Sequence, residues 1–157
     1  MFDIPAWRRL VEEFRLELEA APEGLSDVKL SADSWSLREI VGHLIDSASN
    51  NHQRFVRLQG AAELEFPGYA AEPWVELQRY NAVDWKTLRE LWAHYNRLLL
   101  HLVQTIDPGT LGHRWLADGR SATLEWLVRD YYRHLAEHVE HFRRRLAEVS
   151  RAGDAAR

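Results

Sequence analysis

The sequence has no cysteine among its 157 residues, which excludes disulfide bonds, thiolate nucleophiles and cysteine-based zinc sites. Any metal ion would therefore have to be bound by histidine, aspartate or glutamate side chains. There is no block of basic residues and the formal net charge is −4, so the composition does not favour nucleic-acid binding. No apolar run approaches the roughly 18 residues of a membrane span, and no signal-peptide pattern opens the chain. We expect a cytoplasmic protein that binds no membrane.

The residues that are present are typical of one globular domain. A chain of 157 residues has the usual size of a domain with a single core, and its 46% hydrophobic and 28% charged residues are ordinary values. Seven tryptophans is a high number, and most are expected in the core or in the wall of a pocket. We expect one domain over residues 1–150, followed by a polar, frayed tail at 151–157.

The first half of the chain contains two segments in which hydrophobic residues recur at steps of three and four, as in amphipathic helices. The first segment follows Asp3, which can cap a helix, and stops at Pro22. The second follows Ser36, which has capping-box spacing with Glu39, and runs to about Leu58. We therefore predict two helices before residue 60.

Two more segments of the same kind lie in the second half. Asp84 can cap the third helix, which we expect to end at Asp107. Ser121 can cap the fourth helix, which contains residues 124–145. Because no convincing strand pattern lies between the four segments, the sequence predicts an all-α fold, a four-helix bundle.

Residues 60–82 form a long connection between the second and third helices, with Pro67, Gly68 and Pro73 as helix breakers. A connection of this length is uncommon in a compact domain. It either shapes a binding site or simply covers exposed core, with a short helix near residues 74–80. Its length also indicates that the bundle is not a plain up-down-up-down one.

Histidines provide the candidate metal ligands. His134 and His138 are four residues apart on the last helix, so both project from one face, whereas His141 is expected at the rim. His43 lies near the inward edge of the second helix. Each alone is more commonly a structural or solvent-exposed histidine. Together, His43, His134 and His138 could give three nitrogens to one ion and leave coordination positions open, which is typical of a catalytic site.

Three polar residues follow His43 along the same helix. Asp46 is one turn away and Asn50 a further turn, and either could orient a ligand, although a solvated carboxylate is the commoner role for Asp46. Arg54 could bind an anionic group of a substrate, although a surface ion pair is the commoner outcome. We take Asp46, Asn50 and Arg54 as the candidate catalytic residues.

In their order along the chain, these motifs resemble the DinB-like family, which includes the YfiT-type metal-dependent hydrolases and the bacillithiol S-transferases. The matching pieces are WSLREIVGHLID at 35–46, NHQRFVRL at 51–58 and HLAEH at 134–138. The resemblance spans nearly the whole chain and implies a four-helix bundle, commonly dimeric, with one divalent metal. It assigns that metal to His43, His134 and His138. The connection at 60–82 has no residues that we can match.

The leading hypothesis is a divalent-metal-dependent enzyme, of hydrolase or thiol S-transferase type, that acts on a small molecule. Zinc, nickel, copper and iron suit three imidazoles nearly equally, and the resemblance adds a low-molecular-weight thiol as a candidate cofactor and a homodimer as the expected assembly. Two alternatives stay open. The chain could be a non-catalytic, stress-related bundle that binds a metal or ligand, or its histidines could be structural and hold no ion.

Overall fold

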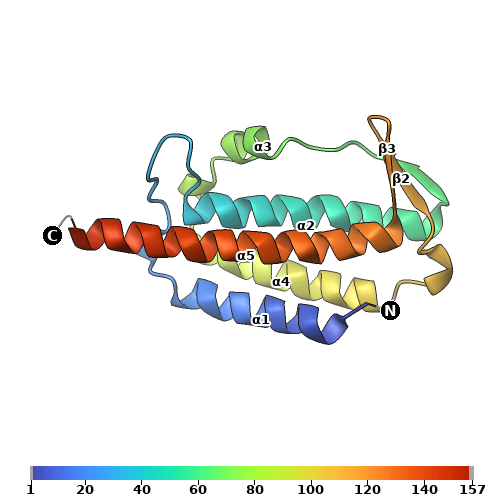
Figure 1. Ribbon diagram of the computed structural model, residues 1–157, viewed down its shortest axis with the longest axis horizontal. Coiled ribbons are helices and arrows are strands. Elements are labelled where there is room, and N and C mark those ends of the chain that lie inside the picture. The colour runs from blue at the N-terminus through green and yellow to red at the C-terminus, as the bar shows by residue number, and fades with distance from the viewer. Residues whose placement is uncertain (1, 156–157) are drawn as a thin grey trace.

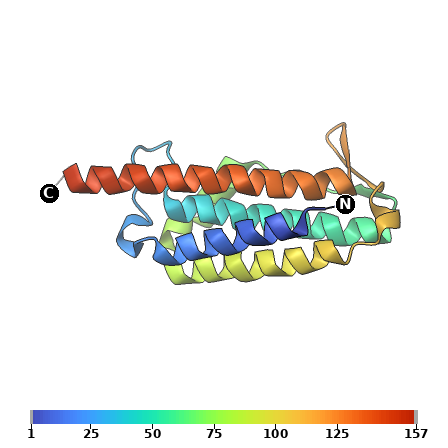
Figure 2. The ribbon, with the colours of Figure 1, turned by 60° about the horizontal axis from the view of Figure 1, so that its bottom comes forward.

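The computed structural model describes residues 2–155, and four long helices dominate it (Figure 1). They are α1 (Ile4–Ala20), α2 (Leu37–Gly60), α4 (Trp85–Gln104) and α5 (Leu124–Ala155). Figures 1 and 2 show that α1 and α5 run in one direction along the bundle, while α2 and α4 run in the other. The predicted four-helix bundle is therefore confirmed. Because α2 and α4 are parallel, the long connection crosses the length of the bundle, and the up-down-up-down order is excluded.

The helix starts show why the sequence forms these elements. At Asp3, Ser36 and Asp84, the side chain accepts a hydrogen bond from the backbone N–H three residues later, as predicted for a cap. The Glu39 carboxylate accepts a hydrogen bond from the backbone N–H of Ser36 at 2.8 Å, which completes the capping box. These bonds satisfy N–H groups that have no partner within the helix, so the first residue of α2 is well defined.

A small sheet, which the sequence pattern did not reveal, lies at the end of the bundle where α5 begins (Figure 1). The strands are β1 (Glu63–Glu65), β2 (Arg114–Ala117) and β3 (Arg120–Thr123). β1 pairs with β2 in parallel, and β2 pairs with β3 antiparallel through a tight turn at Asp118 and Gly119, both with positive φ. Strands of three or four residues are too short for alternation to identify.

The predicted cap of the last helix was also wrong. Ser121 lies within β3, and the hydroxyl of Thr123 accepts the bond from the N–H of Trp126 instead, at 3.1 Å. At its other end, α5 continues to Ala155 through most of the segment that we expected to be a polar tail. Residues 151–155 of that segment are exposed and helical, while 156–157 lie outside the described residues.

The connection between α2 and α4 is folded onto α2 rather than being an open loop. It contains β1, the predicted short helix as α3 (Ala71–Gln78), and a single 3-10 turn, η2 (Tyr80–Ala82). The ring of Tyr80 is 6% exposed and packs so closely over Gly42 that a Cβ there would overlap three of its carbon atoms. The Tyr80 hydroxyl donates to Asp46 Oδ1 at 2.6 Å, one turn further along α2. These two contacts fix the connection beside His43.

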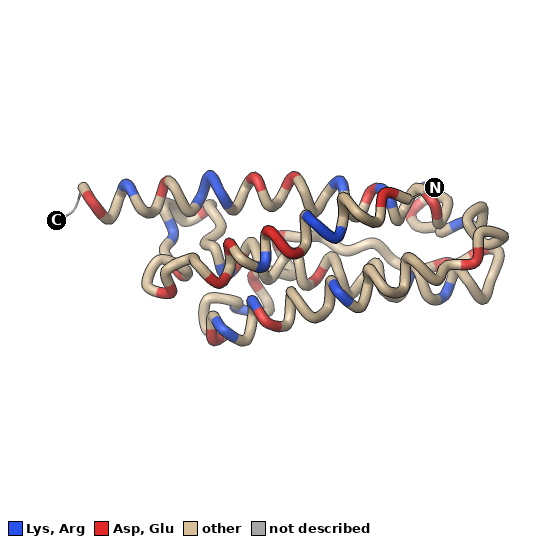
Figure 3. The backbone as a smooth tube through the Cα atoms, turned by 90° about the horizontal axis from the view of Figure 1, so that it is seen from below, with Lys and Arg blue, Asp and Glu red and all other residues tan. Residues whose placement is uncertain are grey.

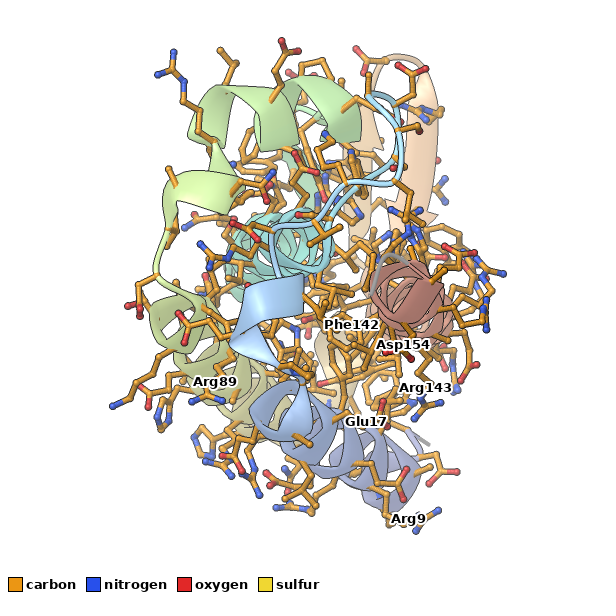
Figure 4. The ribbon with its side chains drawn as sticks, turned by 90° about the vertical axis from the view of Figure 1, so that its left-hand side faces the viewer. Arg9, Glu17, Arg89, Phe142, Arg143 and Asp154 are labelled. Atoms are coloured by element: carbon orange, nitrogen blue, oxygen red, sulfur yellow. The ribbon has the colours of Figure 1, made fainter. Side chains whose placement is uncertain are left out.

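Aromatic side chains join three of the helices at the centre of the bundle. The ring of Phe14 on α1 meets the rings of Trp92 on α4 and Phe142 on α5 edge to face, at centroid distances of 4.8 and 5.1 Å. Such pairs stabilise a core by about 0.5–1.5 kcal/mol beyond the burial of their area. The end-on view in Figure 4 shows Phe142 between the helices, while Arg143 next to it points outward and donates to Glu17 at 2.9 Å.

The outer faces of the helices carry charges of both signs, which are interspersed along the backbone in Figure 3. Many of them form ion pairs within one helix or between neighbouring helices, such as the Arg143–Glu17 pair. Among the helices that the structure describes, none combines the length and the apolar character needed to cross a bilayer.

One ion pair between α1 and α4 is expected to make stability depend on acid pH. Glu12 accepts from Arg97 Nε at 2.8 Å and from Arg15 Nε at 2.9 Å, and hydrogen bonds from Arg97 and then Arg15 lower the pKa of Glu12 from 4.5 to about 2. Because the folded-state pKa is depressed, the stabilisation is present above pH 4.5 and is lost as the pH falls toward 2. We expect Glu12→Gln to lower the free energy of unfolding at pH 7 by less than about 1 kcal/mol, since the pair is exposed.

Urea unfolding of the parent, Glu12→Gln and Glu13→Gln at pH 7, 4 and 3 measures this effect. Glu13 is an exposed neighbour without an ion pair among the described residues, so its variant should match the parent at every pH. The difference in the free energy of unfolding between the parent and Glu12→Gln should become smaller as the pH falls. A difference in the free energy of unfolding that stays constant down to pH 3 would contradict the role given to this ion pair.

Candidate metal centre

The structure brings together the three histidines that were predicted as ligands. His43 comes from α2, and His134 and His138 come from adjacent turns of α5, which lies alongside α2 (Figure 1). Their ligand nitrogens lie within 4.8 Å of one another, and His43 Nε2 is 3.2 Å from His134 Nε2. The ring of His138 is centred 4.5 Å from each of the other two rings. One small ion could therefore contact all three.

The distances and the unpaired atoms fit a bound transition-metal ion. Two nitrogens bound tetrahedrally to zinc at 2.0–2.1 Å are about 3.3 Å apart, close to the separation of His43 Nε2 and His134 Nε2. The Nδ1 atoms of His43 and His138 are buried and have no hydrogen-bond partner among the described residues. Buried polar atoms usually have partners, so the unpaired Nδ1 of His138 is a nitrogen that an ion could take as a ligand. His43 would offer Nε2, which faces His134, and its unpaired Nδ1 would carry the ring proton.

The electrostatics of the cluster keep its histidines neutral. Burial, with smaller contributions from His138 and His134, lowers the pKa of His43 from 6.5 to about 3. Burial and the neighbouring His134 lower the pKa of His138 to about 4, and burial lowers the pKa of His134. A neutral imidazole has a free lone pair on one nitrogen, so near neutral pH these side chains are ready to bind a cation.

Aromatic side chains surround the cluster. The ring of Trp35 lies 5.0 Å from that of His43 and 6.4 Å from that of His138, and Tyr69 lies 6.5 Å from His43. His141 is at the rim, as predicted, with its ring 5.8 Å from His138, and it is not one of the three clustered ligands. Trp35 and Tyr69 therefore form part of the surroundings of the cluster.

Asp46 and Asn50 form their hydrogen bonds outside the histidine cluster. Asp46 is 3% exposed, so it is not a solvated carboxylate, and its Oδ1 accepts from Tyr80 and from Gln78 at 2.7 Å. Asn50 donates to the backbone oxygen of Asp46 on its own helix. Neither makes a hydrogen bond to the three imidazoles within the described chain. Their catalytic role stays a prediction, and the visible function of Asp46 is to hold the connection on α2.

Arg54 lies in a pocket next to the cluster, and it forms no ion pair with any other residue that the structure describes. It is 8% exposed, its guanidinium lies 4.7 Å from the ring centroid of Trp115, and its Nη1 donates to Asn51 Oδ1 at 3.4 Å. The pocket has a volume of about 250 Å³, and His134 forms part of its wall. The other lining residues are Ser47, Asn51, Tyr69, Trp115, Arg120, Trp126, Leu127, Asp130 and Tyr131.

Sequence reasoning missed these other lining residues. Ser47 and Asn51 follow His43 at steps of four residues, so the spacing used for the histidines could have found them. Trp115 could not be found this way, because it reaches Arg54 from a strand about 60 residues further along the chain.

Comparisons with known proteins agree with this fold and cluster. The model of the DinB superfamily matches residues 6–142. A Bacillus cereus protein named "Putative metal-dependent hydrolase" is 25% identical over 154 residues, covering 91% of this chain and 87% of the relative. A Bacillus mycoides protein of the same type has the same identity and coverage.

Two solved structures share the fold. YfiT from Bacillus subtilis, described as a probable metal-dependent hydrolase with an unusual four-helix bundle topology, has a TM-score of 0.71 at 21% identity, over 98% of this chain and 90% of that one. A mycothiol-dependent maleylpyruvate isomerase also has a TM-score of 0.71, at 13% identity, over 87% of this chain and 57% of that one. At these identities the similarity establishes the arrangement of the helices and nothing further.

Proposed function

This chain belongs to the DinB superfamily, and from that premise we propose that it is a divalent-metal-dependent enzyme that acts on a small molecule. The observation that carries the proposal is the cluster of His43, His134 and His138, whose ligand nitrogens lie within 4.8 Å of one another. Three protein ligands leave a coordination position for water or substrate, as in catalytic rather than structural zinc sites. A divalent ion in this position would act as a Lewis acid and would lower the pKa of a bound water or thiol.

The chain itself contributes binding and orientation. The two histidines of α5 and the one of α2 would hold the ion between the helices, and the aromatic rings of Trp35 and Tyr69 lie next to His43. Because His134 also borders the pocket that contains Arg54, a substrate in that pocket would lie beside the ion. Zinc, nickel and iron all suit this donor set, and the metal present in the cell depends on availability as well as affinity.

Hydrolysis and thiol transfer are both supported as the reaction. Relatives that align with 91% of this chain are named as metal-dependent hydrolases, which favours hydrolysis. The resemblance of the sequence motifs to a family that includes thiol S-transferases makes thiol transfer the second candidate. The thiol would have to be a separate small molecule, because this chain has no cysteine. We place hydrolysis first, since its support comes from sequence similarity over the greater length.

A substrate screen on metal-loaded protein tests the proposal. We expect the zinc- or nickel-loaded protein to turn over either a small ester or amide, or a thiol together with an electrophile such as monochlorobimane. The activity should disappear on chelation, return when the metal is added back, and be absent from His134→Ala. His101→Ala, which changes an exposed histidine on α4, serves as the matched control.

Activity that survives chelation or the loss of His134 would contradict a metal-dependent reaction. Stable metal binding without turnover of any substrate would favour a non-catalytic metal-binding bundle. The expected homodimer and the cytoplasmic location stay predictions. Leu91 and Leu98, both 48% exposed on α4, offer an apolar surface to a second copy.

A further inference from the structure

The buried guanidinium of Arg54 needs an explanation that the metal cluster does not supply. Arg54 is 8% exposed, and a buried arginine is normally paired with a carboxylate, because removing its charge from water costs several kcal/mol. No ion pair of the described chain includes Arg54. The positive charge is therefore held inside the protein without the partner that usually accompanies it.

The contacts of Arg54 leave one edge of the guanidinium free. Nη1 donates to Asn51 Oδ1 over a long 3.4 Å, and the flat face lies against the ring of Trp115. Nε is buried and has no partner among residues 2–155. The free edge of a guanidinium, with parallel N–H groups on Nε and Nη2, is the geometry that binds a carboxylate through two hydrogen bonds.

One acidic side chain lies in the same pocket. Asp130 contributes to its wall and interacts electrostatically with Arg54, but the Asp130 carboxylate accepts hydrogen bonds from Arg133 on the outer face of α5. It therefore does not occupy the free edge of Arg54. The pocket wall carries two arginines, Arg54 and Arg120, and one carboxylate, Asp130, so the net charge of its wall is +1, which fits a single carboxylate.

The pocket joins this arginine to the metal cluster. Arg54 lies at one part of its wall and His134 at another, so one small molecule can reach both. The rings of Tyr69, Trp115, Trp126 and Tyr131 line the space between, which suits an apolar or aromatic body. A volume of about 250 Å³ restricts the occupant to a small molecule.

We propose that the substrate is a small carboxylic acid with an apolar or aromatic body, and that Arg54 binds its carboxylate while its reactive group faces His134. This inference rests on the proposed function, because it places the substrate of the metal centre in this pocket. Arg54 acts by binding and orientation, and it holds the substrate in one direction relative to the ion.

The proposal is tested with benzoate and benzamide, which have the same shape but differ in charge. We expect the parent to bind benzoate at least about tenfold more tightly than benzamide, as measured by calorimetric titration, because the bond to Arg54 is charge-assisted. Arg54→Gln should remove this preference. Arg54→Lys keeps a positive charge but not the paired N–H groups, and it should bind benzoate more weakly than the parent.

Two comparisons make the result specific. Arg57→Gln changes an arginine on the next turn of α2 that bonds to Gln53 and does not line the pocket, so it should keep the full preference for benzoate. Each titration is carried out on metal-free and on zinc-loaded protein, with metal content measured in parallel. The preference in metal-free protein excludes direct binding of benzoate to the ion, and its loss in Arg54→Gln assigns it to Arg54 rather than to Arg120, which also lines the pocket.

The outcomes separate this inference from the proposed function. Equal binding of the two probes by the parent, no binding of benzoate, or a preference that survives in Arg54→Gln would each overturn the carboxylate site, even if the protein binds zinc. If Arg54→Gln does not fold, unchanged benzoate affinity in Arg54→Lys would overturn it instead. A benzoate preference in a protein that binds no metal would support the pocket and contradict the metalloenzyme.

Discussion

Gly42→Ala should destabilise the protein by about 3 kcal/mol, although alanine is normally the better helix former by about 1 kcal/mol. The added methyl group would overlap the Cγ, Cδ2 and Cε2 atoms of Tyr80. The ring cannot easily move, because it is 6% exposed and its hydroxyl is held by Asp46. For a domain of this size, such a change lowers the melting temperature by about 6–12 °C, measurable by thermal unfolding in the absence of added metal.

A double-mutant cycle assigns this effect to the Tyr80 contact. In a Tyr80→Ala background the overlap is gone, so adding Gly42→Ala should be neutral or slightly stabilising. Gly60→Ala is the control at another position in α2, since a Cβ there meets nothing within 4 Å. An equal loss of stability from Gly42→Ala in both backgrounds would show that Tyr80 is not the cause.

His43→Ala should weaken zinc binding at least about 100-fold, or about 2.7 kcal/mol. Mutation of a residue that only hydrogen-bonds to a metal ligand typically lowers metal affinity 10–100-fold. The loss of a ligand itself should therefore lower the affinity by about 100-fold or more. His43 is the member of the cluster that comes from α2, so its loss would leave only the two histidines of α5 to hold the ion. Competition with a chromophoric chelator measures the affinity.

Two other histidine variants test how many histidines bind the ion. His141→Ala should keep the affinity of the parent, because His141 lies at the rim and outside the three-ligand cluster. His94→Ala changes an exposed histidine of α4 and should also have no effect. If His141→Ala lowered zinc affinity as much as His43→Ala does, the site would have four protein ligands. A closed site of that kind is typical of structural rather than catalytic zinc.

The helices and the clustering of the three histidines could be predicted from the sequence because most of their signals are local. Caps such as Ser36 with Glu39 act over three residues, and the pair His134 and His138 shares a helix face at a fixed spacing. His43 was placed by its position at the inward edge of α2. The resemblance to a known family pointed to the same three histidines, and the geometry of the structure brings them together.

The features that were missed depend on contacts between distant parts of the chain. β1 pairs with β2 across about 50 residues, and each strand is too short to show alternation. The role of Asp46 depends on Tyr80, which reaches it from the far end of the connection. The burial of Arg54 depends on Trp115. Helical periodicity carries no information on such contacts, so the pocket became visible only with the fold.

Anomalous X-ray diffraction at the metal absorption edge, from crystals of the zinc-loaded protein, tests the central claim most directly. We expect one anomalous peak per chain, enclosed by the rings of His43, His134 and His138, with nitrogens at about 2.0–2.1 Å. Such a peak would join α2 and α5 at one ion. No peak at this position, or a peak bound only by other residues, would contradict the assignment of a metal centre to this bundle.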